Sequence, residues 1–219
     1  MRALSAQDAR ARLLLADDHA MIAEALGVYL QTFYMVVGVV NDGRAMVEES
    51  IRLKPDGVIV DVGMPRLNGL DAAQRLKERI PGIKFVFLTT QDDSNMAAAA
   101  LELGPIGFVN KHSPAQELLR AIDHVLQGQP YVDPRMRAVD WEATKSRARQ
   151  YWTEMTPRQK DVVQLLAEGR TAKEIAGLLD VSHRTVELHK QNIKNSFNLK
   201  NDADLVLFAL KRGIISIDA

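Results

Sequence analysis

Runs of apolar residues alternate with amphipathic segments along the first 127 residues of the chain. The runs are rich in β-branched residues and predict buried strands at 12–18, 35–40, 57–62, 84–90 and 106–111. Apolar residues then recur at helical spacing and predict helices at 21–30, 45–51, 70–80, 94–103 and 114–127. Ser113 is the expected N-cap of the last helix, with Pro114 at its first position. Five rounds of strand and helix predict a doubly wound α/β domain with a five-stranded parallel sheet.

The pattern changes at Gly128. The segment GQPYVDPRMR holds two prolines and no apolar helical face, so we interpret it as the exit from the first domain. The next stretch, 139–152, predicts a helix whose Trp141 and Trp152 pack on a neighbour, and the alternative is a flexible tether.

Residues 154–217 predict four helices and no strand, which indicates a small all-α domain. Thr156 followed by Pro157 starts the first helix, and Thr171 and Ser182 cap the next two. The fourth helix is expected from about Ala203 to Arg212, and Gly213 ends it.

Composition and charge add little to this organisation. The chain has no cysteine, which excludes disulfides, thiolate metal sites and cysteine nucleophiles. A net charge of zero combines 13 Lys/Arg and 16 Asp/Glu in residues 1–127 with 15 and 12 in residues 128–219. The charged N-terminus lacks the apolar core of a signal peptide, and no apolar run reaches the ~18 residues of a membrane span, so we expect a soluble, cytoplasmic protein.

Chemically active side chains stand at the ends of the predicted strands. Asp17 and Asp18 close the first strand, Asp61 the third, Thr89 the fourth and Lys111 the fifth. In a parallel sheet these ends meet at one edge. Clustered carboxylates favour a hard cation such as Mg²⁺, and a free carboxylate beside a lysine and a hydroxyl has the parts for phosphoryl transfer onto aspartate.

Residues 12–127 resemble the receiver domain of two-component response regulators, which has a flavodoxin-like fold. The resemblance is carried by the Asp17-Asp18 pair, by DVGMPRLNG with its Asp-x-x-Met-Pro pattern, by Thr89 and by GFVNK. It implies that Asp61 is the phosphoacceptor and that a sensor histidine kinase is the phosphoryl donor.

The same resemblance assigns the neighbouring residues. Asp18, Asp61 and the Gly63 carbonyl would bind Mg²⁺, with Asp17 acting through a water molecule. Lys111 would hold the phosphoryl oxygens, and Thr89 would move to bond them, with Phe108 as the second switch residue. Read from the residues alone, Asp18 could instead be a helix N-cap, Lys111 a solvated strand end, and Thr89 and Phe108 core residues.

Three positions depart from the family pattern. Thr90 stands where a small residue is usual, Phe108 lacks the hydroxyl of a tyrosine, and Pro105 stiffens the loop before the fifth strand. We expect these departures to affect rates and switching without removing a catalytic group.

The second half carries a helix-turn-helix candidate across LLDVS, with four Lys/Arg and one Glu in residues 182–200. The segment from Thr156 to Ile193 resembles the LuxR-type DNA-binding domain of NarL/FixJ-family regulators; its sequence is TPRQKDVVQLLAEGRTAKEIAGLLDVSHRTVELHKQNI. The resemblance implies that Thr185 and core-facing Val186 open the recognition helix. Its DNA-binding residues would be Arg184, Thr185, Glu187, Leu188, Lys190, Gln191 and Lys194.

Within that set, Arg184 and Lys190 would contact phosphates, whereas Glu187, Leu188 and Gln191 would contact base edges. Asn198 stands where glycine is frequent, and it tolerates the left-handed conformation that the turn needs.

We therefore expect a receiver at 1–127, a partly helical linker at 128–153 and a DNA-binding domain at 154–219. The hypothesis is a phosphorylation-dependent regulator of promoter DNA, not an enzyme beyond its own phosphotransfer and dephosphorylation. The resemblance implies that a resting receiver covers the recognition helix and that phosphorylation uncovers it or promotes homodimerisation. Leu205, Val206 and Leu210 of the fourth helix are the expected dimer contact, or else pack within the domain.

Two other functions are weighed against this one. A phosphatase of the haloacid-dehalogenase type forms an aspartyl phosphate but needs an acid two residues after the nucleophile, where this chain has Gly63. A regulator that binds DNA without being phosphorylated would show no phosphoryl transfer to Asp61.

Overall fold

The computed structural model describes residues 10–90, 100, 103–136, 155–212 and 214–215. In its first part, parallel strands form one sheet in the order β2-β1-β3-β4-β5-β6. The strands are β1 Arg12–Ala16, β2 Met35–Val40, β3 Gly57–Asp61, β4 Lys84–Thr89, β5 Ile106–Asn110 and β6 Tyr131–Val132. The predicted doubly wound parallel sheet is confirmed.

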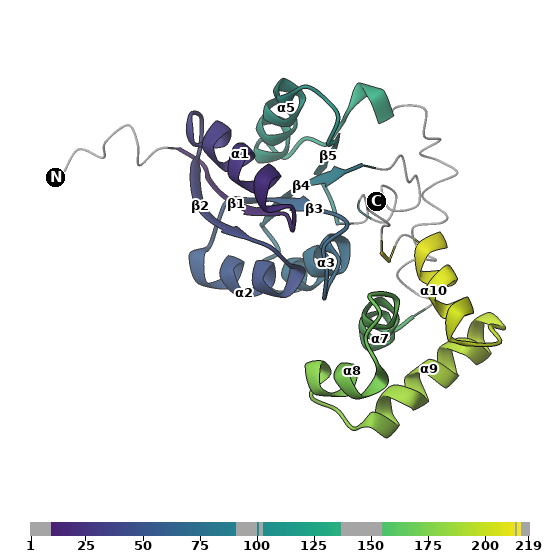
Figure 1. The fold of residues 1–219 in the computed structure, drawn as a ribbon. Coiled ribbons are helices and arrows are strands. Elements are labelled where there is room, and N and C mark those ends of the chain that lie inside the picture. The colour runs from purple at the N-terminus through teal and green to yellow at the C-terminus, as the bar shows by residue number, and fades with distance from the viewer. Residues whose placement is uncertain (1–9, 91–99, 101–102, 137–154, 213, 216–219) are drawn as a thin grey trace.

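Helices cover both faces of this sheet (Figure 1). They are α1 Ala20–Gln31, α2 Gly43–Leu53, α3 Gly69–Arg79 and α5 Ala115–Leu126. Successive residues of a strand point to opposite faces, so Val58 and Val60 join the core beneath α2 and α3. Ile59 joins the core beneath α1 and α5. Burial on both faces explains why this strand is an unbroken apolar run.

Two details differ from the predictions. A sixth strand, β6, pairs with β5 through Gly107 and Tyr131, so the segment expected to leave the domain is part of its sheet. A short 3-10 helix, Pro134–Met136, follows β6. Ser113 is not the N-cap of α5, because Pro114 occupies that position and the helix begins at Ala115.

Two predicted helices cannot be compared in this way. The helix expected at 139–152, with Trp141 and Trp152, lies outside the described residues, and so does nearly all of the helix expected at 94–103. Among the helices that the structure describes, none has the length and apolar character needed to cross a membrane.

The small domain contains α7 Pro157–Ala167, α8 Ala172–Leu179, α9 His183–Phe197 and α10 Asp202–Lys211. Thr156 and Thr171 form capping boxes, and the Ser182 side chain accepts a hydrogen bond from the Thr185 amide, as the sequence predicts. Asn198 ends α9 with a φ of 54°, which confirms the left-handed turn.

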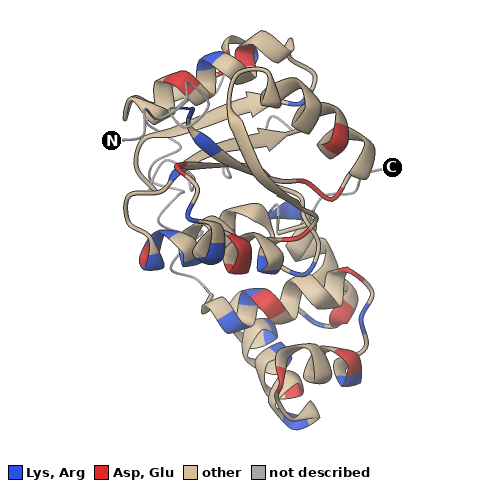
Figure 2. Cartoon of the chain, turned by 90° about the vertical axis from the view of Figure 1, so that its left-hand side faces the viewer, with Lys and Arg blue, Asp and Glu red and all other residues tan. Residues whose placement is uncertain are grey.

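The two domains meet through α7. In Figure 1 α7 is the part of the small domain nearest to α3, and α9 lies on the far side. Acidic and basic residues stand on both sides of the junction (Figure 2).

Candidate functional site

The candidate site is formed where β1, β3, β4 and β5 end. Each strand stops at or next to a residue singled out from the sequence, and the register places the Asp61 Cα opposite that of Leu88. The loop after β3 folds back toward the end of that strand, where the Gly69 amide donates a hydrogen bond to the Val62 carbonyl at 3.0 Å. A Cβ at Gly69 would lie 2.1 Å from the Asp61 carbonyl oxygen, so only glycine can occupy this position.

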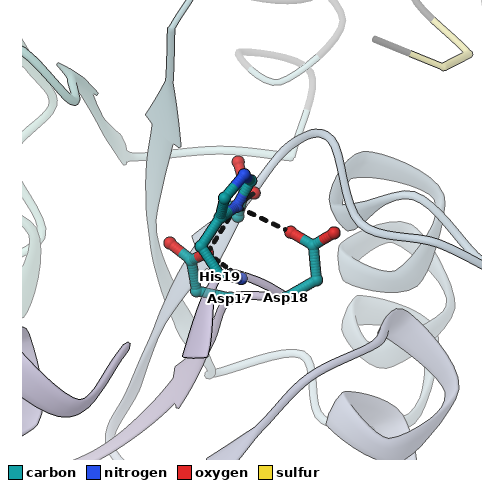
Figure 3. A group of neighbouring side chains, drawn as sticks. Asp17, Asp18 and His19 are labelled. Atoms are coloured by element: carbon teal, nitrogen blue, oxygen red, sulfur yellow. Dashed lines mark hydrogen bonds and ion pairs between the residues drawn. The ribbon is translucent and has the colours of Figure 1, made fainter. Parts of the chain in front are cut away.

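The carboxylates of Asp17, Asp18 and Asp61 come together as predicted, and His19 joins them. Figure 3 shows His19 beside Asp17 and Asp18. His19 Nδ1 lies 3.2 Å from Asp17 Oδ1, 3.0 Å from Asp18 Oδ1 and 3.9 Å from Asp61 Oδ2. One ligand atom from each of these four residues lies within 4.8 Å of the others. The N-cap of α1 is His19, so the alternative role of Asp18 as helix cap is wrong.

Lys111 closes the other side of the cluster. Its Nζ lies 2.9 Å from Asp61 Oδ2 and 3.0 Å from Asp17 Oδ2, and its side chain is only 7% exposed. Burial lowers the pKa of the ammonium, but Asp61 and Asp17 outweigh that effect and leave the pKa raised. The ammonium therefore stays charged, and the alternative of a solvated strand end is wrong.

The pKa of the Asp61 carboxyl is raised to about 6. Burial is the largest cause and the charge of Asp17 adds to it, while Lys111 and the Gly63 amide lower the pKa and limit the rise. The Gly63 amide donates to Asp61 Oδ1 at 3.3 Å. A buried carboxylate with an ammonium on one oxygen is poised to act as a nucleophile once a cation or phosphoryl group shares its charge.

The donor set of the cluster fits a hard divalent cation. Three carboxylates in one pocket supply the oxygen ligands that Mg²⁺ prefers, and two of them, Asp17 and Asp61, are nearly fully buried. The acidic pocket is therefore compatible with Mg²⁺. Reasoning from the sequence missed His19, although its place directly after the aspartate pair was the available signal.

The predicted switch residues lie on β4 and β5, the strands that follow β3 in the sheet. Thr89 is the last residue of β4 and is 7% exposed, and its carbonyl accepts a hydrogen bond from the Lys111 amide at 2.8 Å. Phe108 is 1% exposed and points into the core, 6.1 Å from the ring of Phe87. Thr90, the residue directly after β4, is exposed.

The predicted recognition helix α9 presents several of its DNA-binding candidates to solvent. Arg184 and Gln191 are exposed, and Leu188 is 58% exposed. Val186 is fully buried, as predicted. The receiver packs against α7, not against this face, so the expectation that the receiver covers the recognition helix is wrong for this structure.

Lys190 and Lys194 are held by other residues in the small domain. Lys190 Nζ lies 2.7 Å from Asp202 Oδ2 and 3.0 Å from Glu187 Oε1, and it is largely buried. Burial lowers the pKa of Lys190, but these two carboxylates raise it above its ordinary value. Lys194 Nζ lies 3.1 Å from Asp202 Oδ1, so this aspartate on α10 holds both lysines.

The fourth helix of the small domain has both a buried and an open face. Leu205 is fully buried in the core of its own domain, which agrees with the alternative of internal packing for that residue. Val206 and Leu210 are half-buried, and Leu207 is 53% exposed.

Two families match this chain. The response regulator receiver domain family matches residues 13–123, and the luxR family of bacterial regulatory proteins matches residues 153–209. The two matches correspond to the two folded parts that the structure shows.

Curated relatives align over nearly the whole chain. The transcriptional regulatory protein YdfI of Bacillus subtilis is 28% identical over 213 residues, covering 94% of this chain and 99% of its own. The oxygen regulatory protein NreC of Staphylococcus epidermidis is 32% identical over 215 residues, covering 93% and 99%.

Solved structures share the fold. The RcsB response regulator of Salmonella typhimurium superposes with a TM-score of 0.62 at 22% identity, over 93% of this chain and 98% of that one. RcsB bound to the promoter P1flhDC in the presence of phosphomimetic BeF3- gives a TM-score of 0.61 at 22% identity, over 92% and 99%.

Proposed function

We propose, from the premise that this chain belongs to the NarL/FixJ family of two-component response regulators, that phosphoryl transfer to Asp61 controls how its C-terminal domain binds promoter DNA. The observation that carries the proposal is the buried Asp61 carboxylate with Lys111 Nζ at 2.9 Å, at the edge of the sheet where the aspartate pair also lies. A DNA-binding domain at 154–219 and action in the cytoplasm are part of the same proposal, and the receiver extends past the expected limits of 1–127 through β6 and the 3-10 helix, which shortens the linker expected at 128–153.

The chemical step is a substitution at phosphorus. A carboxylate oxygen of Asp61 forms a bond to the phosphorus of a kinase phosphohistidine, and the phosphorus–nitrogen bond breaks. The histidine leaves as neutral imidazole when its second ring nitrogen carries a proton. Lys111, already bonded to Asp61, is placed to hold the oxygens of the transferred group. Thr89, at the end of the next strand, is the hydroxyl that would bond the same group.

Asp18, Asp61 and the Gly63 carbonyl would hold Mg²⁺, with Asp17 acting through water. When bound, this cation neutralises charge on the phosphoryl oxygens. His19 lies among these carboxylates and would orient Asp17, to which both its backbone amide and its Nδ1 are hydrogen-bonded.

The output is a change in DNA binding. Because α9 is open while α7 packs on the receiver, dimerisation explains regulation better than uncovering of the recognition helix. The half-buried Val206 and Leu210 and the exposed Leu207 place apolar surface on α10 for a second copy.

The test is a binding titration with a DNA duplex that the protein selects from a random pool. Intact protein is compared with and without Mg²⁺ and a small phosphodonor, beside Asp61→Asn. We expect tighter binding only for phosphorylated wild type, together with a dimer on a sizing column. Equal binding in every sample would instead support a DNA-binding protein that phosphate does not control.

A further inference from the structure

The loop after the phosphoacceptor is held from outside its own domain. Between β3 and α3 the chain runs through residues 62–68, which include Gly63, the proposed carbonyl ligand of the cation. Gln164, on α7 of the DNA-binding domain, bonds to both ends of this segment. Its Nε2 donates to the Met64 carbonyl at 3.0 Å, and its Oε1 accepts from the Asn68 amide at 2.9 Å.

The middle of the loop is held by the same helix. Arg66 has a φ of 64°, a left-handed conformation that is unfavourable for a residue with a side chain. Its amide donates to Glu168 Oε1 at 2.8 Å, and Gln164 Nε2 donates to that oxygen at 2.9 Å. The disfavoured conformation of Arg66 is thus supported by a residue about a hundred positions away.

Two ion pairs, one of them fully buried, hold α7 in place beside this loop. Lys160 Nζ lies 3.0 Å from Asp71 Oδ1 with both side chains at most 5% exposed, and Arg75 lies 2.6 Å from Asp161. Gln164 itself is 1% exposed. A helix of an independent small domain would keep such polar side chains in water, so their burial with partners on α3 and on the loop before it marks a specific interface.

We propose that Gln164 and Glu168 are positioning residues of the phosphoacceptor site. They hold the loop that carries Gly63 in one conformation, so docking of the DNA-binding domain and cation binding at Asp61 stabilise one another. A loop that is already ordered loses less conformational entropy when it binds a ligand. The proposal rests on the proposed function, because it needs a cation at Asp61. It gives the docked state a role in signalling, consistent with a recognition helix that docking leaves open.

The test uses the intact protein and Mn²⁺ as the cation probe, with free Mn²⁺ measured by electron paramagnetic resonance. Gln164→Met removes both loop hydrogen bonds and keeps an unbranched side chain of similar length. Gln116→Met makes the same change at an exposed position on α5 and serves as the matched control. We expect Gln164→Met to weaken Mn²⁺ binding by at least ~5-fold, the lower end of typical coupling between sites. The control should bind like wild type.

Because the coupling between two sites is reciprocal, cation binding should also stabilise the docked α7, and this can be measured without a variant. In the wild type, Mn²⁺ should slow hydrogen exchange in the peptide that covers α7. Wild-type protein that binds no Mn²⁺ would overturn this proposal and the cation site of the proposed function together. Equal Mn²⁺ affinities for wild type and Gln164→Met, or unchanged exchange in α7, would overturn the coupling alone.

Discussion

The charge on Asp61 destabilises the folded receiver, and Asp61→Asn should remove that effect. Burial raises the pKa of this carboxyl from its ordinary value of 3.8 to about 6, even with Lys111 beside it. A tenfold change in an acid constant corresponds to about 1.4 kcal/mol, so the ionised carboxylate lowers stability by about 3 kcal/mol relative to the neutral acid. At neutral pH we expect the asparagine variant to be more stable by about 2–3 kcal/mol.

The pH dependence follows from the same values. Between 3.8 and about 6 the native state binds a proton at Asp61 that the unfolded chain does not bind. Protonation of Asp61 should therefore raise the free energy of unfolding of the wild type as the pH falls through about 6. Asp61→Asn should lack this increase.

Hydrogen exchange of peptides from β3 and β4 measures this stability, because these buried strands exchange through unfolding of the receiver. The measurement is made in chelator at about pH 7 and about pH 5, with exposed Glu24→Gln as the control, which should change stability by less than ~0.5 kcal/mol. Equal protection of wild type and Asp61→Asn at both pH values would refute the reasoning.

Three further predictions concern single residues. Lys111→Ala should abolish phosphorylation of Asp61 by a small phosphodonor, because it removes the ammonium that lies 2.9 Å from that carboxylate; mass spectrometry of the intact protein measures this. Arg184→Ala should weaken DNA binding evenly across sequences and flatten its salt dependence, whereas Gln191→Ala should relax preference at one base position, as binding to a panel of duplexes would show. Asn198→Ala should lower the stability of the small domain by about 1 kcal/mol in thermal unfolding, because alanine is strained at a φ of 54°; an unchanged melting temperature would contradict this.

The receiver site was predictable because its residues stand at the ends of strands that the apolar pattern reveals. The carboxyl ends of parallel strands lie at one edge of a sheet, and this rule alone is enough to predict that Asp17, Asp61 and Lys111 lie close together. The strand β6 escaped prediction because two residues carry no periodicity and Pro130 precedes them. Hydrogen bonds and sheet register, not local pattern, make Tyr131 and Val132 a strand.

Contacts between distant elements were not predictable. The burial of Lys190 depends on Asp202, which belongs to the next helix, so the sequence indicated a basic surface where the structure has an ion-pair network. Lys160 and Gln164 are polar residues on a helix that the sequence places in the small domain, and nothing local indicates that they face α3.

The open recognition helix has a consequence for how a promoter would be found. A protein whose α9 faces solvent before phosphorylation would bring the exposed Arg184 to the phosphates of any DNA and could move along it, since such binding reads charge and not sequence. A signal arriving at Asp61 would then act on molecules already on the chromosome. Phosphorylation would lengthen the time these molecules stay at their promoter. The search for that promoter along the DNA would take place before the signal arrives.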